Sequence, residues 1–316
     1  KKEGSLLGHA RDRERQYDWL GAAALYESAL GQAPEQDVSK SGDMFERLAY
    51  AQYRAAMQSS EAGEFTERMH AALKSFERAA ETYGRQSEPN TTVGVLRCAA
   101  TAAYLRFWLA HTIEDRKRHL DEAWGSAKAA LKAFEGTGDA WNYGTTYNRL
   151  SLIPVLRFYA EWDGRSQGSN LRDAIQFGER AISLLSTSQE PEELAAAYVG
   201  TARLLETIDG HLARFDEKEG LLRKAFECWQ KACSLSQETA MLGLVLCPSF
   251  WPLGTDEALE IANKAVEYGR KTRDRLIVGT LLKELAFHKA WSSDLIEDLD
   301  RWREVLRETL ESADSA

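Results

Sequence analysis

The chain has 316 residues, 44% hydrophobic and 28% charged, which is the composition of a globular protein with ample length for a sizeable core. Its net charge of −9 argues against general nucleic-acid binding, which needs a basic surface. No run of about 18 apolar residues occurs in the sequence, so we expect no membrane-spanning helix and no membrane partner.

The chain begins with Lys1 rather than methionine, and we expect it to be part of a longer protein. Its four cysteines form no Cys-x-x-Cys pair and lie in apolar helical contexts, which is typical of buried free thiols in a reducing compartment. We therefore expect a cytoplasmic protein. The cysteines are Cys98, Cys228, Cys233 and Cys247.

Apolar residues recur three and four positions apart almost throughout, and no convincing alternating segment interrupts them. This periodicity predicts an all-α protein of about a dozen helices. Helix-breaking residues fall at 31–34, 84–89, 136–138, 164–168 and 188–191. Pro191, followed by two glutamates, predicts a helix start, because proline suits the first turn and acids favour the positive end of the helix dipole.

A motif of two alanines or similar small residues around a central residue recurs in the second helix of each predicted helix pair. Five copies are 50 or 51 residues apart, and a sixth, at Ala258, Ala262 and Ala265, follows after only 33. The five copies are Ala22, Tyr26 and Ala29; Ala72, Phe76 and Ala79; Ala123, Ala127 and Ala130; Ala174, Gly178 and Ala181; and Ala225, Trp229 and Ala232.

The first helices follow the same period. Large residues 51 positions apart, at Phe45, Leu96, Tyr147 and Tyr198, are each followed four residues later by a small one. The small residues are Ala49, Ala100, Ser151 and Ala202. A bulky side chain fills the gap between neighbouring helices, and a small residue one turn further on lets two helix backbones approach closely.

In the first copy the second-helix motif is followed by Pro34, and in the first helix Phe45 precedes Leu48 and Ala49. This pattern resembles the tetratricopeptide repeat. The resemblance implies an all-α, right-handed α-solenoid of about six such helix pairs plus a C-terminal capping helix at 293–312. The family's usual unit has 34 residues, so the longer period here predicts helices about two turns longer, as in the family's sensor and adaptor domains.

We interpret residues 1–316 as a single helical-repeat domain. Residues 239–254 break the period, and we expect a truncated first helix and an apolar loop there. The predicted units are 10–35, 41–85, 91–136, 140–188, 191–237 and 239–272, followed by C-terminal helices over 274–312.

Motifs that carry chemistry are missing from the sequence. The six histidines form neither a His-x3-His nor a His-Glu-x-x-His pattern, and no phosphate-binding loop or Gly-x-Ser-x-Gly elbow occurs. We therefore expect no catalytic residue, no cofactor and no metal site.

The first helices line the concave face of such a solenoid. Positions one, five and eight residues after each large residue point away from the helix's own partner, and they mix aromatic, polar and basic side chains. Aromatic and arginine side chains dominate protein interfaces, so this mixture favours recognition of a protein or peptide. The predicted partner-binding residues are Glu46, Tyr50, Tyr53, Arg97, Thr101, Tyr104, Asn148 and Arg203.

These patterns predict a non-enzymatic scaffold or sensor domain for protein–protein interaction. The alternative is an intramolecular regulatory domain of a multidomain signalling protein, such as an ATPase or a cyclase. Nucleic-acid binding is the less favoured class, given the acidic balance. The sequence does not decide which face binds the partner, because the convex face or the helix ends, near the basic run from Arg270 to Arg275, are alternatives to the concave face. It does not set the oligomeric state either.

Overall fold

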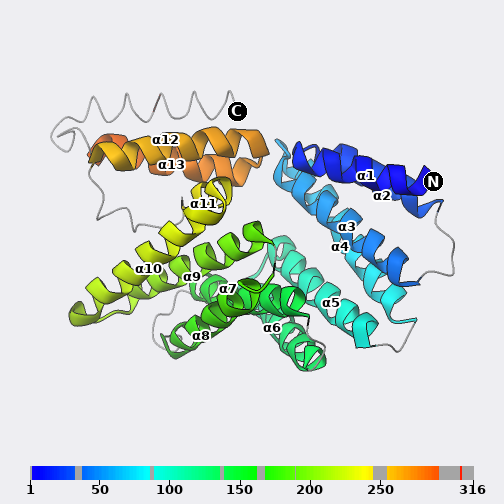
Figure 1. Cartoon of the computed structure of the whole chain (residues 1–316), viewed down its shortest axis with the longest axis horizontal. Coiled ribbons are helices and arrows are strands. Elements are labelled where there is room, and N and C mark those ends of the chain that lie inside the picture. The colour runs from blue at the N-terminus through cyan, green and yellow to red at the C-terminus, as the bar shows by residue number, and fades with distance from the viewer. Residues whose placement is uncertain are drawn as a thin grey trace. The chain divides into compact units, whose positions relative to one another are not determined.

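The computed structural model describes residues 2–32, 38–85, 89–135, 139–161, 168–188, 190–244, 255–291 and 307. These residues form helices and no strand, which confirms the expected all-α helical solenoid (Figure 1). In chain order the helices are α1 (Lys2–Arg15), α2 (Trp19–Leu30), α3 (Val38–Met57), α4 (Ala62–Tyr83), α5 (Pro89–Leu109), α6 (Ile113–Phe134), α7 (Ala140–Glu161), α8 (Gly168–Leu185), α9 (Pro191–His211), α10 (Phe215–Leu235), α11 (Gln237–Leu244), α12 (Thr255–Thr272) and α13 (Arg275–Trp291).

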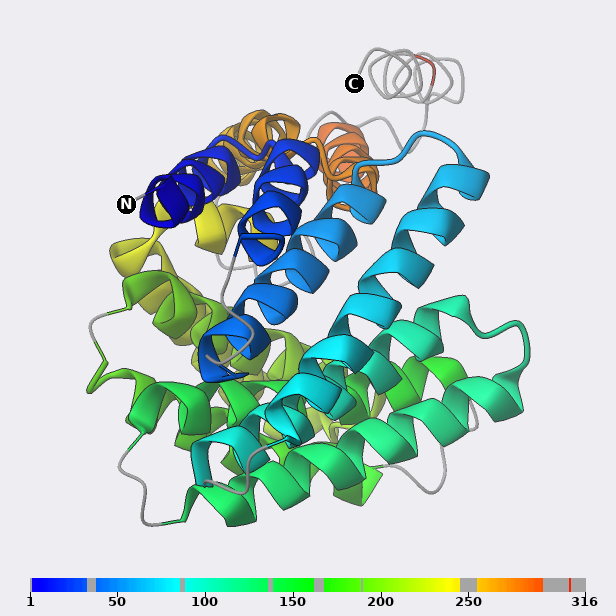
Figure 2. The ribbon, with the colours of Figure 1, turned by 90° about the vertical axis from the view of Figure 1, so that its right-hand side faces the viewer.

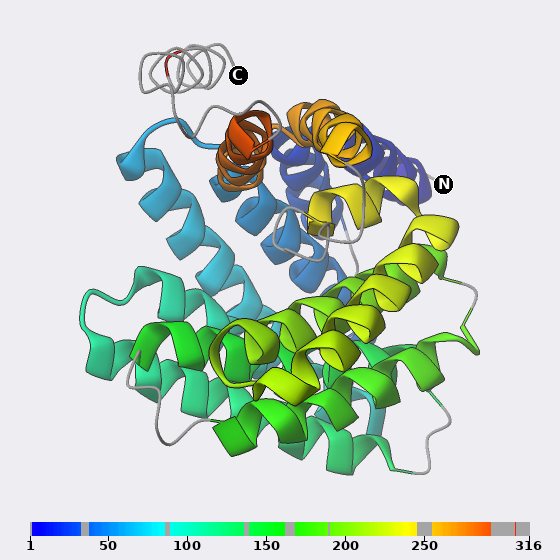
Figure 3. The ribbon, with the colours of Figure 1, turned by 90° about the vertical axis from the view of Figure 1, so that its left-hand side faces the viewer.

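The contacts between helices divide the chain into two compact units, unit 1 (Lys1–Asp163) and unit 2 (Gly164–Ala316). In unit 1 each helix from α1 to α7 packs against the next one along the chain, and Figure 2 shows α3 and α4 side by side in blue to cyan. In unit 2 the same chain-order packing runs from α8 to α13, with the orange pair α12 and α13 visible in Figure 3. Packing of sequence neighbours is the pattern of a repeat protein.

Helix starts in both units follow capping chemistry. The Asp18 carboxylate accepts a hydrogen bond from Gly21 N at the start of α2, and the Thr112 hydroxyl accepts one from Asp115 N at the start of α6. Helix α9 begins at Pro191, as the sequence predicts.

The repeat spacing corresponds to equivalent packing positions. The small residues Ala49, Ala100, Ser151 and Ala202 are all buried, with at most 7% of their surface exposed. The large residues that precede them are half-buried rather than enclosed. In two pairs a cation of the second helix covers the exposed ring face: Arg78 lies over Phe45 at 5.1 Å, and Lys231 lies over Tyr198 at 5.6 Å.

The break in the period appears as a short helix. Helix α11 has 8 residues, which confirms the predicted truncated first helix. The predicted apolar loop, from residue 245 onward, and the predicted capping helix over 293–312, apart from residue 307, lie outside the described residues. Among the helices that the structure describes, none combines the length and the apolar character needed to cross a membrane.

Candidate functional site

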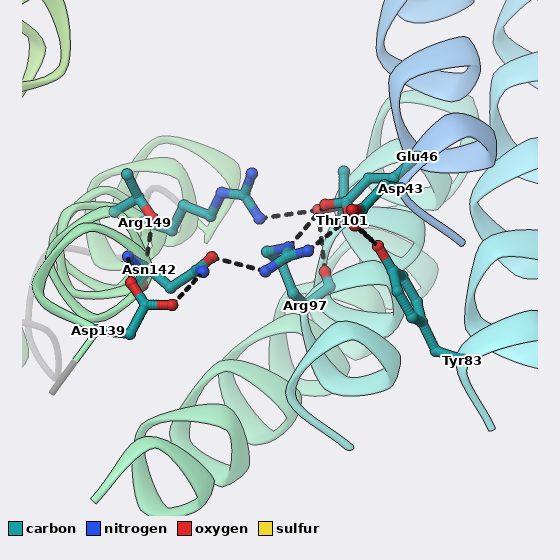
Figure 4. A network of polar contacts seen from close by, with 9 residues as sticks. Asp43, Glu46, Tyr83, Arg97, Thr101, Asp139, Asn142 and Arg149 are labelled. Atoms are coloured by element: carbon teal, nitrogen blue, oxygen red, sulfur yellow. Dashed lines mark hydrogen bonds and ion pairs between the residues drawn. The ribbon is translucent and has the colours of Figure 1, made fainter. Parts of the chain in front are cut away.

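First helices of three successive pairs, α3, α5 and α7 of unit 1, are joined by a polar network centred on Arg97 (Figure 4). Arg97 Nε donates to Glu46 Oε1 at 2.7 Å and Arg97 Nη2 donates to Glu46 Oε2 at 2.6 Å. Arg97 Nη1 donates to Asn142 Oδ1 at 2.6 Å. A two-point contact between a guanidinium and a carboxylate is among the strongest and most directional hydrogen-bond arrangements in proteins.

The ion pair is largely withdrawn from water, with 14% of the Arg97 side chain and 19% of the Glu46 side chain exposed. Burial alone raises the pKa of Glu46, but the hydrogen bonds and charge of Arg97 outweigh it and hold that pKa below its ordinary value. Burial lowers the pKa of Arg97, and the contacts with Glu46 more than reverse this effect. Both groups therefore stay charged, and their two hydrogen bonds join α3 to α5.

Tyr83, at the end of α4, completes the acidic side of this network. Its hydroxyl donates to Asp43 Oδ1 at 2.5 Å, and Glu46 Oε2 lies 3.3 Å away. Burial, and next the charge of Glu46, raise the pKa of Tyr83, so the hydroxyl remains a donor. The Tyr83 ring fits between α3 and α5 because each helix has a glycine there: a β-carbon would lie 2.5 Å from the ring at Gly42 and 2.7 Å from it at Gly94.

Gly94→Ala is expected to destabilise the protein by roughly 1–3 kcal/mol, because the added methyl group overlaps the Tyr83 ring. The matched control is Gly125→Ala in α6, where a β-carbon would meet nothing within 4 Å. That change should stabilise the protein by up to about 1 kcal/mol, since alanine favours helix. Urea denaturation measures both changes, and a Gly94→Ala variant as stable as Gly125→Ala would contradict the close approach.

On the α7 side the network continues through one hydrogen bond to α5 and one at the start of α7 itself. Arg149 Nη1 donates to the Thr101 hydroxyl at 2.9 Å, and Asp139 Oδ2 accepts from Asn142 Nδ2 at 2.6 Å. Asn148 lies on α7 at the repeat position of Glu46 and Arg97. Its Oδ1 atom is buried and has no hydrogen-bond partner among the described residues. A buried carbonyl oxygen without a donor costs free energy, and because solvent does not reach this oxygen, a ligand on the surface does not reach it either.

Aromatic side chains flank the network on α3 and α5. Tyr50 is 44% exposed, and its ring meets the Trp19 ring edge-on at 5.6 Å. Tyr53 lies 6.4 Å from Tyr50, ring centre to ring centre. Tyr104 is half-buried and contacts Trp108 edge-on at 6.2 Å. Tyr53 and Tyr104 also pack against the core of unit 1, so Tyr50 presents the most exposed ring of the three.

Seven of the eight predicted partner-binding residues lie on α3, α5 and α7, and we call them the first-helix surface. They are Glu46, Tyr50, Tyr53, Arg97, Thr101, Tyr104 and Asn148. The eighth, Arg203, is half-buried on α9 in unit 2. Glu46 and Arg97 differ from expectation, because they bind each other within the unit instead of projecting freely. Their role in partner binding stays a prediction.

Four further residues belong to the site that the repeat pattern did not identify: Asp43, Tyr83, Asn142 and Arg149. Two signals were available in the sequence. Glu46 and Arg97 carry opposite charges one repeat apart, and Gly42 and Gly94 lie inside helical stretches, where glycine usually has a packing reason. In the part of the chain that the structure describes, no cluster of three or more His, Cys, Asp or Glu side chains is placed to hold a metal ion.

The lowered pKa of Glu46 makes stability depend on acid pH. The pKa in the folded state lies below the unfolded value of about 4.3, so the ion pair contributes its full stability above that value and loses it as the pH falls through the folded pKa. Between about pH 6 and about pH 3 the wild type should lose more unfolding free energy than Glu46→Gln, whose side chain does not titrate. Equal losses in denaturation curves would contradict this assignment.

No protein-family model and no curated protein match the sequence. Among the solved structures that match, two cover nearly all of this chain and share its fold. One is the Rap conjugation gene regulator of the plasmid pLS20 in complex with the Phr* peptide, at 13% identity and a TM-score of 0.61, covering 98% of this chain and 74% of that one. The other is aspartyl phosphate phosphatase F from Bacillus subtilis, at 15% identity and a TM-score of 0.57, covering 96% of this chain and 68% of that one. These likenesses support a helical-repeat fold.

Proposed function

We propose that unit 1 recognises a peptide, or a segment of a partner protein, on the first-helix surface, and that it acts by binding rather than by catalysis. The observation that carries the proposal is the row of partly exposed tyrosines, Tyr50, Tyr53 and Tyr104, which lie four or seven residues along α3 and α5 from the Glu46–Arg97 pair and so share its helix face. Aromatic anchors supply much of the energy of protein interfaces, and side chains fixed in advance lose little entropy on binding.

The network and the rings have different roles in this proposal. Glu46 and Arg97 hold α3 and α5 in register and contribute rigidity. Arg149 is exposed and uses one of its five N–H donors on Thr101, which leaves donors for a carboxylate or carbonyl of the partner.

One further observation supports a peptide as the ligand class, and another supports the location that we propose for the protein. The Rap regulator that shares the fold is described in complex with a peptide, which makes a peptide a reasonable ligand class to test here. The cysteines within the described residues, Cys98, Cys228 and Cys233, carry free thiols, which suits the reducing cytoplasm that we propose as the location.

The test selects peptides from a random displayed library against the full chain and then maps the bound peptide by amide hydrogen exchange. We expect peptide-dependent protection on α3, α5 and α7, because these helices carry the tyrosines and the network. Protection confined to α4 and α6, or to unit 2, would reject the first-helix surface as the recognition site.

A further inference from the structure

A pocket of about 470 Å³ lies in unit 1 where the last turn of α2 meets α3 and α4. Its apolar wall includes Leu30 from α2 and Phe45 and Leu48 from α3. Helix α2 has 12 residues, whereas the next second helix, α4, has 22. The pocket is lined by the C-terminal end of α2, at Leu30 and Gly31, together with side chains of α3 and α4.

This pocket is separate from the first-helix surface. At 3.6 residues per turn, Phe45 and Leu48 lie roughly 100–160° around the α3 axis from Glu46 and Tyr50. A ligand in the pocket would therefore contact a different side of α3 from a peptide on the first-helix surface.

The pocket is lined by two basic side chains and one acidic side chain, and within the described part of the chain only the acidic one has a polar partner at the pocket. Lys74 and Arg78 stand one turn apart on α4, both are exposed, and neither forms an ion pair with an acid among the described residues. The Arg78 guanidinium lies 5.1 Å from the centre of the Phe45 ring, which holds its charge beside the apolar wall. The acid of the lining, Glu27, accepts a hydrogen bond from Gln52 at 3.4 Å. Gln52 in turn accepts a hydrogen bond from Ser75 at 2.7 Å.

We propose that this pocket binds a small amphipathic anion, with an apolar body against Leu30, Phe45 and Leu48 and an acidic head group between Lys74 and Arg78. The volume falls in the range of small-molecule sites, which combine apolar walls with a few polar groups that fix orientation. Two cations without an acidic partner among the described residues attract an anion locally, although the whole chain carries a charge of −9. Free carboxylates with an alkyl or aryl body are the ligand class with this chemistry.

The test uses 1-anilinonaphthalene-8-sulfonate, an aromatic anion that fluoresces in apolar sites, with the full chain. We expect saturable binding that Lys74→Gln with Arg78→Gln weakens on the order of tenfold or more, because the head group loses its charge-assisted hydrogen bonds. The matched control is Arg180→Gln, since Arg180 is an exposed cation at the same repeat position in unit 2 and should leave binding unchanged. Both positions are exposed, so melting temperatures should stay close to wild type.

Competition distinguishes the pocket from general apolar binding. Decanoate should displace the probe at least about tenfold more effectively than decanol, which has the same chain without the charge. Ala71→Phe, which places a ring in the lining, should weaken the probe without removing either cation. Unchanged probe binding in the double variant, or equal displacement by decanol, would overturn the proposal whatever the result for peptides on the first-helix surface.

Discussion

Arg97→Ala is expected to lower the unfolding free energy by about 3–5 kcal/mol, which is the loss typical of a buried ion pair broken on one side. The cost arises because the Glu46 carboxylate, whose side chain is 19% exposed, loses both hydrogen bonds from the guanidinium and the charge that compensates its burial. The Tyr83 hydroxyl remains 3.3 Å from Glu46 Oε2, and this neutral group does not replace the positive charge of the guanidinium.

The matched control lies on the same helix. Arg106 of α5 pairs with Glu77 of α4, but the two side chains are 36% and 45% exposed. Water screens such a pair, and Arg106→Ala should cost about 0–1 kcal/mol. Urea denaturation followed by helical ellipticity compares the two variants. Equal losses of unfolding free energy in Arg97→Ala and Arg106→Ala would show that the buried Glu46–Arg97 pair stabilises the fold no more than an exposed pair does.

A double variant separates the ion pair from its packing. Glu46→Leu with Arg97→Met removes both charges and keeps apolar volume, and it should recover most of the stability that Arg97→Ala loses. If the double variant is as unstable as Arg97→Ala, the hydrogen bonds to Asn142 and Tyr83 carry the stability instead.

The fold followed from residue spacing because repeats place chemically similar residues in equivalent positions. Small residues 51 apart, such as Ala49 and Ala100, mark where helices approach, and both are buried. The half-exposure of Phe45 was harder to foresee, because it depends on a long side chain, Arg78, that covers the ring from the neighbouring helix. Periodicity assigns a residue to a helix face, but it does not say which distant side chain reaches that face.

For the candidate site, too, the sequence predicted the positions of residues along the helices but not all of the contacts between them. The repeat register placed Glu46 and Arg97 at equivalent positions of neighbouring first helices, where opposite charges can meet. Tyr83 joins them from a second helix only because Gly42 and Gly94 leave room for its ring. Such a contact depends on helix separation, which spacing in the sequence does not give. The repeat register therefore assigned residues to one face of the first helices, but it did not separate side chains that bind one another, such as Glu46 and Arg97, from those that remain exposed, such as Tyr50.

That distinction determines which residue should test binding. Tyr50 is 44% exposed on α3, and its truncation to alanine should leave the fold intact while lowering affinity for a selected peptide by about 2 kcal/mol or more, which is about 30-fold. Tyr50→Phe keeps the ring and should retain most of the affinity. The matched control is Ile113→Ala, since Ile113 is 53% exposed on α6 and lies outside the first-helix surface. Fluorescence anisotropy with a labelled peptide measures all three variants. Wild-type affinity in Tyr50→Ala, or an equal loss in Ile113→Ala, would show that the tyrosine row does not anchor the ligand.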